Sequence, residues 1–120
     1  MHFKFLASLL AILSCLIFNI PAQAQTNFPE KPVKLIVPFP PGQATDIIAR
    51  MIAEKLTIAW GQQVIVENKT GVPGMVAGST AAPDGYTMTM GTSGVLAVNP
   101  AVFAKLPYDV TKDFIYVGGL

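Results

Sequence analysis

Two loops of the sequence have the composition needed to hold a small anion. Residues 40–45 combine two prolines, a glycine and a threonine, and residues 91–94 place Thr92 and Ser93 between two glycines. Small residues let a ligand approach the backbone, and N–H groups together with the hydroxyls of Thr45, Thr92 and Ser93 can donate hydrogen bonds. The first loop also precedes a predicted helix, whose unpaired N–H groups and dipole favour a negative charge. The expected ligand is a small carboxylate or a similar anion, and no lysine or arginine is needed to hold it.

Each of these features also has a structural interpretation, which the sequence leaves open. A loop rich in glycine and proline before a helix is typical of a plain connection. Asp46 suits a helix cap, and as a ligand contact it would repel a carboxylate unless it met an amino group or bridged through water. Residues 71–74 are not a phosphate-binding loop, because the Gly-Lys-Ser/Thr that such a loop needs does not follow.

The residue types needed for most enzymatic chemistry are missing from the predicted mature chain. The only histidine, His2, and the only cysteine, Cys15, lie in an apolar leader. Their loss argues against Ser-His-Asp and Cys-His catalysis, zinc ligation and disulfides. A pair of carboxylates remains formally possible, but the acidic residues are scattered and suit helix ends, turns and the surface. The sequence therefore predicts no enzyme, no metal site and no cofactor.

The leader has the order of an export signal. Lys4 is followed by apolar residues 5–20, and Pro21 precedes Ala22-Gln23-Ala24, the small-residue pattern of a cleavage site. A membrane span takes about 20 apolar residues, and this run is shorter and has polar breaks. Lipid attachment at Cys15 is an alternative, although the run continues past it. Residues 1–24 are predicted to be a cleaved signal peptide and residues 25–120 the mature domain, without membrane insertion.

The charge of the mature chain is balanced. The sequence has eight Lys plus Arg and seven Asp plus Glu, and removal of Lys4 leaves seven of each. Nucleic acids and anionic membrane surfaces both require a basic excess, so neither is expected as a partner.

The elements around the first loop read as a βαβ unit. Residues 33–37 and 63–67 are short, β-branched runs typical of buried strands. The segment between them has helical periodicity, with Thr45 or Asp46 as the cap and Gly61 at the end. The apolar residues expected to face the sheet are Ile48, Ile52, Leu56 and Ala59. Strand, helix and strand in about 35 residues predict a parallel sheet, and ligands lie beyond the carboxyl ends of such strands.

The remaining segments predict further short elements. We expect a loop at 70–74, at most a short helix at 75–82, a turn at 83–85 and a third strand at 86–90. Asn99 reads as the cap and Pro100 as the first residue of a helix that continues to Leu106. Residues 114–117 are predicted to form a fourth strand.

Several ordered motifs give the sequence a family resemblance. They are residues 34–42 (KLIVPFPPG), 44–46 (ATD), 66–69 (VENK), 82–87 (APDGYT), 91–93 (GTS) and 99–100 (NP). Together they resemble the tripartite tricarboxylate transporter substrate-binding receptors, often called the Bug family. The resemblance implies an α/β fold of the periplasmic-binding-protein type (type 2), with this chain as an incomplete parallel-sheet first lobe and the second lobe absent.

The resemblance also implies a function and a set of contact residues. Such receptors are periplasmic, close on a small organic acid without chemistry and pass it to membrane transporter subunits. The ligand-binding residues that the resemblance implies are Phe39, Pro40, Gly42, Gln43, Ala44, Thr45 and Asp46, together with Thr92 and Ser93.

Three departures from the family pattern keep other hypotheses open. Gln43 stands where the family usually has glycine, and residues 73–77 (PGMVA) replace the usual Gly-Gly-Asn-Ile-Gly. The sequence also corresponds to only the first third of the usual length. The chain could therefore be a non-functional remnant of such a receptor, or a small secreted domain with an interaction role of its own.

Overall fold

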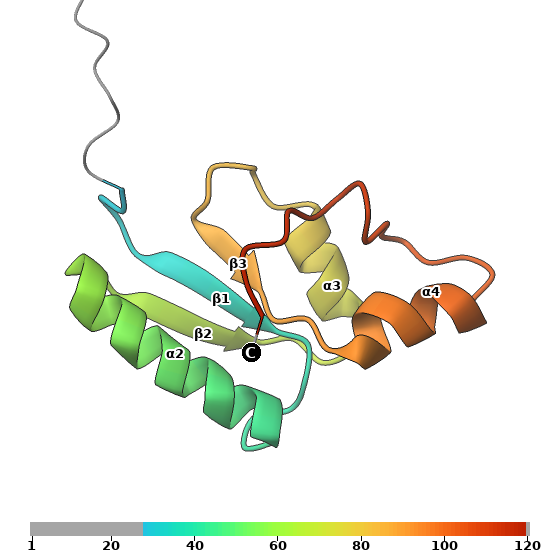
Figure 1. Ribbon diagram of the computed structural model, residues 1–120, viewed down its shortest axis with the longest axis horizontal. Coiled ribbons are helices and arrows are strands. Elements are labelled where there is room, and N and C mark those ends of the chain that lie inside the picture. Colours follow the sequence, from blue (N-terminus) through green and yellow to red (C-terminus); the bar gives the residue numbers. More distant parts are fainter. Residues whose placement is uncertain (1–27, 120) are drawn as a thin grey trace, which may run out of the picture.

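Three parallel strands form the sheet of this chain, which the computed structural model describes over residues 28–119. The predicted signal peptide lies outside the described residues. The elements, in order, are β1 (Val33–Val37), α2 (Ala44–Trp60), β2 (Val64–Asn68), α3 (Val72–Ser79), β3 (Thr87–Thr89), the π-helical turn η1 (Gly94–Val98) and α4 (Asn99–Val102). The strand order is β2-β1-β3, and both pairs are parallel (Figure 1). The predicted α/β class, the βαβ unit and the first three strands are confirmed.

The central strand is covered on both faces, as its continuous apolar run predicts. Val33, Leu35 and Val37 form one core cluster with α2 and Val64. Ile36, which alternates with them, is also buried, and α3 packs on β1 and β3 from the opposite side of the sheet (Figure 1). Because all three strands are parallel, their carboxyl ends lie at one edge of the sheet, where the loops begin.

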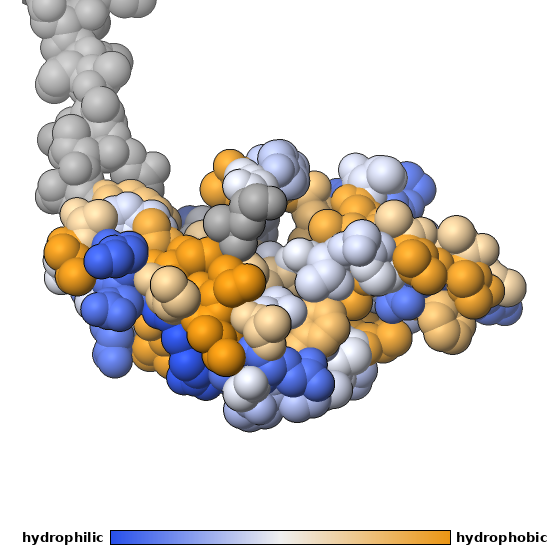
Figure 2. Space-filling view, turned by 60° about the horizontal axis from the view of Figure 1, so that its bottom comes forward, coloured by the Kyte–Doolittle hydropathy of each residue, from blue (hydrophilic) through white to orange (hydrophobic). Residues whose placement is uncertain are grey.

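The face that α2 turns to the sheet matches the predicted one in part. Leu56 packs against the core as predicted and Ile52 is half-buried, whereas Ala59 is exposed. Ala49 and Ala53 are its buried apolar residues, whereas Ile48 is 41% exposed. The small side chains of the two alanines let the helix lie close to the sheet. The alanines are therefore buried, and larger apolar side chains on the helix are not. The large apolar side chains that remain exposed on α2 are Ile47, Ile48, Met51 and Ile58. Figure 2 shows apolar patches beside charged ones on the side of the molecule where α2 lies.

The starts of two helices are also corrected. Helix α2 begins one residue before Thr45, and its cap is Gln43, whose carbonyl accepts the N–H of Ile47 at 3.0 Å. Its predicted end is confirmed, because Gly61 takes the left-handed conformation with φ of 66°. Helix α3 covers Val72–Ser79 instead of 75–82, because Pro73 occupies the first turn, where no N–H is required.

The prediction that Asn99 caps a helix is wrong. The chain is already helical from Gly94, and the N–H of Asn99 donates to the carbonyl of Gly94 across a π-helical turn. In the same pattern the N–H of residue 100 would donate to the carbonyl of Val95, but Pro100 has no N–H. The hydroxyl of Tyr108 replaces it and donates to the carbonyl of Val95 at 2.9 Å. Helix α4 ends at Val102, four residues before the predicted end.

The predicted strand at residues 114–117 is absent from the described chain. Ile115 and Val117 are 90% and 86% exposed, and no strand within residues 28–119 pairs with this segment. A strand needs a neighbour for its backbone hydrogen bonds, so a β-branched composition alone does not produce one. Within the same described range, no helix has the length and apolar character needed to cross a membrane.

Candidate functional site

The loops that follow the three strands meet at one edge of the sheet. The N–H of Lys69 donates to the carbonyl of Val37 at 2.9 Å, and the N–H of Met90 donates to that of Ile36 at 2.8 Å. Phe39, from the first loop, packs beside Val72 and Leu96 on a buried cluster of Met75, Val95 and Tyr108. The loop after β1 and the loop after β3, both singled out from the sequence, therefore lie at the same edge.

The first loop, residues 38–43, is here called the β1–α2 loop. Three of its six residues are prolines and have no N–H to donate. Gly42 takes a positive φ of 82°, a conformation that glycine adopts without strain. Its N–H donates to the Asp46 carboxylate at 2.8 Å. The N–H of Gly42 is thus engaged inside the protein instead of facing an incoming ligand.

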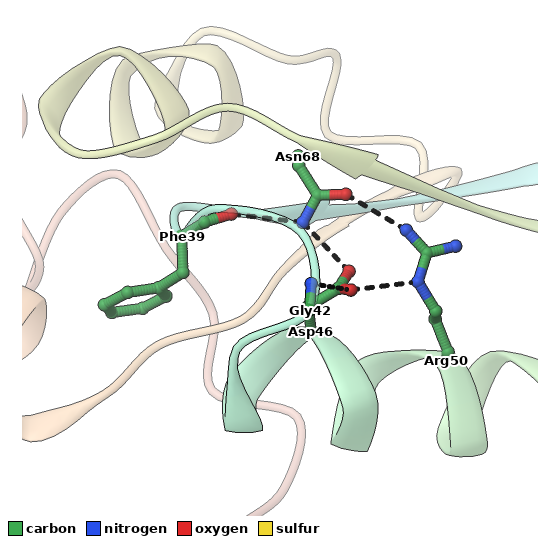
Figure 3. A network of polar contacts seen from close by, with 5 residues as sticks. All are labelled: Phe39, Gly42, Asp46, Arg50 and Asn68. Carbon is green, nitrogen blue, oxygen red and sulfur yellow. Dashed lines mark hydrogen bonds and ion pairs between the residues drawn. The ribbon is translucent and has the colours of Figure 1, made fainter.

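Asp46 is the centre of a polar network under this loop (Figure 3). It is 2% exposed and is the one charged residue buried within the described chain. Oδ2 accepts from Gly42 and from Arg50 Nε at 3.0 Å, and Oδ1 accepts from Asn68 Nδ2 at 2.9 Å. Asn68 Nδ2 also donates to the carbonyl of Phe39 at 3.1 Å. These five residues, from the loop, α2 and β2, are called the Asp46 network.

The network holds Asp46 in its charged form. The hydrogen bond from Arg50 is the largest cause, and those from Gly42 and Asn68 add to it, which lowers the pKa of Asp46 to about 2. Arg50 also donates through Nη2 to Asn68 Oδ1 at 3.1 Å. The carboxylate is therefore ionised at neutral pH, and its charge is offset by a partly exposed guanidinium.

The start of α2 leaves several donors at the edge of the sheet. The first hydrogen bond of the helix is that of the Ile47 N–H to Gln43. Within residues 28–119, the N–H groups of Ala44, Thr45 and Asp46 have no acceptor. Gln43 and Ala44 are exposed, and Thr45 is half-buried. This arrangement can bind an anion through backbone groups.

The second loop, predicted as residues 91–94, covers residues 90–93 between β3 and η1. Ser93 is exposed, Thr92 is half-buried, and the carbonyl of Thr92 accepts the N–H of Leu96 at 2.9 Å. The loop leads directly into η1, so the two hydroxyls lie at the start of a short helical segment. The structure thus places all nine predicted contact residues in segments at the same edge, and their contact with a ligand remains a prediction.

Asn68 and Arg50 belong to the Asp46 network but were not predicted as site residues. Arg50 lies four residues after Asp46 on α2, a spacing at which opposite charges pair, so this contact could have been expected. The sequence gives a weaker indication that Asn68 belongs to the network. It is a polar residue at the carboxyl end of a parallel strand, but its partner Phe39 lies 29 positions away in the sequence.

A surface hollow lies elsewhere and does not suit a carboxylate. It has a volume of about 710 Å³ and includes Leu96, Phe103, Tyr108, Asp109 and Asp113, but none of the predicted contact residues. The two carboxylates would repel an anionic ligand. We therefore place the candidate site at the edge formed by the strand ends.

Comparison with known proteins assigns the chain to a family. The family described as tripartite tricarboxylate transporter family receptor matches residues 48–120. The chain belongs to this family. It is 40% identical over 101 residues to protein BugT of Bordetella pertussis, which covers 81% of this chain and 31% of BugT. The chain thus spans about a third of the length of such relatives.

Solved structures agree with this assignment. The periplasmic binding protein BugD is 34% identical with a TM-score of 0.68, over 72% of this chain and 30% of BugD. MatC from Rhodopseudomonas palustris, solved with bound malate, is 38% identical with a TM-score of 0.68, over 72% of this chain and 31% of MatC. The fold is therefore that of part of a periplasmic-binding-protein lobe, as the sequence motifs indicated.

Proposed function

We propose that the protein is an extracytoplasmic receptor that binds a small carboxylate and delivers it to the membrane subunits of a tripartite tricarboxylate transporter. The observation that carries this proposal is the set of N–H groups at the start of α2 that have no acceptor among residues 28–119, at the edge where the two predicted contact loops lie. Membership of the receptor family supports the role, and the malate bound to MatC supports a dicarboxylate as the ligand class.

The proposed binding mode uses backbone donors and hydroxyls. A carboxylate at the start of α2 would accept from the N–H groups of Ala44 and Thr45, where the helix dipole also favours it. Gly42 contributes space, because nothing lies within 4 Å of where its side chain would begin. Support for this first segment is geometric, since the family match begins at residue 48. The proposed contact residues are Phe39, Pro40, Gly42, Gln43, Ala44, Thr45, Thr92 and Ser93, together with Asp46, whose carboxylate is paired within the protein and whose contact would be through its backbone N–H.

The proposal involves binding and release without a covalent step. In the described residues, no group of three His, Cys, Asp or Glu side chains is arranged to hold a metal ion. The acidic side chains near the loops are used within the protein, with both oxygens of Asp46 already paired. A receptor needs no more than shape and donors that match the ligand.

Export to the periplasm is part of the same proposal. Residues 1–24 are proposed to be removed after Ala24, so that the mature protein begins at Gln25. Mass spectrometry of the protein recovered from the periplasm should give an intact mass that starts at Gln25. Recovery of the unprocessed chain from the cytoplasm would contradict this part of the proposal.

Thermal unfolding with and without ligand tests the binding role. A ligand that binds the native state raises the midpoint, and at a hundred times Kd it stabilises by about 2.7 kcal/mol. We expect malate, succinate or citrate to raise the midpoint, and the corresponding uncharged amides to have no effect. A cooperative melt that none of the acids shifts would contradict the proposed function.

A further inference from the structure

We propose that Asp46 and Asn68 are positioning residues, which hold the β1–α2 loop in the shape that receives the ligand and act through its backbone. This inference rests on the proposed function, because it assigns a role within the same binding site. The observation behind it is the Asp46 network, which joins the loop, α2 and β2 through hydrogen bonds of 2.8 to 3.1 Å (Figure 3).

The β1–α2 loop has few means of holding its own shape. Pro38, Pro40 and Pro41 cannot donate backbone hydrogen bonds. The N–H of Gly42 donates to the Asp46 side chain, and the carbonyl of Phe39 accepts from the Asn68 side chain. Two side chains therefore supply the contacts that backbone groups supply in an ordinary turn.

Asn68 fixes the loop and the helix at once. Its Nδ2 donates to both the Phe39 carbonyl and Asp46, while its Oδ1 accepts from Arg50. A reversed amide would place oxygen against two acceptors and nitrogen against a donor, so only one orientation satisfies all three contacts. The carboxyl end of β2 thereby sets the distance between the start of the loop and the first turn of α2.

Asp46 is an unexpected residue beneath a site for anions, because its charge would repel a carboxylate. The network resolves this conflict by surrounding the charge with donors from Gly42, Arg50 and Asn68. An asparagine at position 46 has one acceptor oxygen, and its NH₂ group would meet a donor. Substitution by the neutral isostere should therefore disturb the loop even though the volume is unchanged.

The test compares variants of the network with a matched control on the same two elements. Asp46→Asn and Asn68→Ala remove contacts at the loop. Thr57→Val removes the hydrogen bond from the Val64 N–H to Thr57 Oγ1 (3.0 Å), which joins α2 and β2 at the opposite end of the sheet. Malate affinity is measured by calorimetry on the full protein, at a temperature where circular dichroism shows each variant to be folded. Exchange of the Gly42 amide is measured by NMR.

We expect the two network variants to bind malate at least tenfold more weakly and to exchange the Gly42 amide at least tenfold faster. Thr57→Val should lower the melting midpoint and leave the affinity and the Gly42 exchange unchanged. Arg50→Gln, at a partly exposed side chain, should weaken malate binding about threefold, and it carries the test if a buried variant does not fold.

Exchange of the carboxylate and the amide between positions 46 and 68 should rescue part of the malate affinity. Asn68→Asp alone places two carboxylates together and should bind most weakly of all. The double variant Asp46→Asn with Asn68→Asp restores a carboxylate–amide pair and a partner for Arg50, although the bond to Phe39 stays lost. We expect it to bind malate at least threefold more tightly than Asn68→Asp alone.

Two results would overturn the inference and a third would have a different meaning. Unchanged malate affinity in folded Asp46→Asn and Asn68→Ala would remove the positioning role. An equal loss of malate affinity in Thr57→Val would show that the network variants bind weakly because the fold is less stable, and not because the loop has lost its shape. If the unsubstituted, folded protein binds no dicarboxylate, the proposed function itself fails, and the positioning role fails with it.

Discussion

The two loops at the candidate site are held in different ways. The β1–α2 loop accepts one backbone bond at each end, from Gly71 and Ile47. Its middle is held by side chains of α2 and β2 around a buried carboxylate. The loop at residues 90–93 is held by backbone bonds, and the helical turn behind it depends on one hydroxyl, that of Tyr108, which comes from a stretch without helix or strand. A loop rich in proline has few backbone donors and needs side chains to fix it, whereas a loop without proline can use its own backbone.

This difference suggests that one loop is preorganised for the ligand and that the other can adjust to it. A fixed loop presents donors whose ordering is complete before the ligand arrives, which lowers the entropy lost on binding. The second loop carries the exposed Ser93 and the half-buried Thr92 without a comparable side-chain network in the described residues, so we expect it to adjust more readily to ligands of different size. If the two loops differ in rigidity, substitutions beside one loop should leave the other unchanged.

Gly74→Ala should be the most disruptive substitution. A Cβ at Gly74 would lie 2.9 Å from Pro38 Cα and would also overlap the carbonyl of Lys69. Helix α3 would have to move away from the start of the β1–α2 loop, with a loss of about 1–3 kcal/mol that urea unfolding can measure. The matched control is Gly94→Ala beside the second loop, where the nearest atom is 3.6 Å away. It should be neutral or stabilise by up to about 1 kcal/mol, and equal losses would contradict the comparison.

Tyr108→Phe should weaken the second loop selectively. It leaves the buried carbonyl of Val95 without its donor, which costs about 1–2 kcal/mol in unfolding free energy. Amide exchange should rise in η1 and stay unchanged at Gly42. Tyr116→Phe is the control, because Tyr116 is 78% exposed and its substitution should change stability by less than about 0.5 kcal/mol. Faster exchange at Gly42 in Tyr108→Phe would show that the loops are not independent.

Acid should loosen the β1–α2 loop only at very low pH. The pKa of Asp46 falls from 3.8 in the unfolded chain to about 2 in the fold, so the unfolded state takes up the proton first. The stability that Asp46 contributes is therefore complete above about pH 4 and is lost as the pH falls toward 2. Melting midpoints measured from pH 6 to pH 2 should decline less steeply in Asp46→Asn. Parallel curves for the two proteins would contradict this assignment.

Glu67→Gln should have the smallest effect. Glu67 pairs with Lys34 at 3.1 Å and with Lys69 at 3.2 Å, but all three side chains are at least a third exposed. Exposed pairs contribute little, so the loss should be at most about 0.5 kcal/mol and should disappear in 1 M salt. A loss that persists in salt would show that surface pairs, as well as the buried network, fix the end of β2.

Much of the fold could be predicted because its signals are local. The apolar run of β1, the stop at Gly61 and the alternation of strand and helix depend on neighbouring residues, and all were confirmed. The failures occurred where a local pattern needs a distant partner. Residues 114–117 have the composition of a strand but no strand beside them, and the burial of α2 followed two alanines because the sheet lies close to the helix.

The same division applies to the candidate site. The sequence by itself determined that two loops of small residues follow parallel strands, and that one of them opens a helix with free donors. It could not show that Asn68 would reach back 29 positions to Phe39 and 22 positions to Asp46. Only the tertiary structure decided which N–H groups face inward, because hydrogen bonds between distant segments form only after the sheet and α2 have packed together.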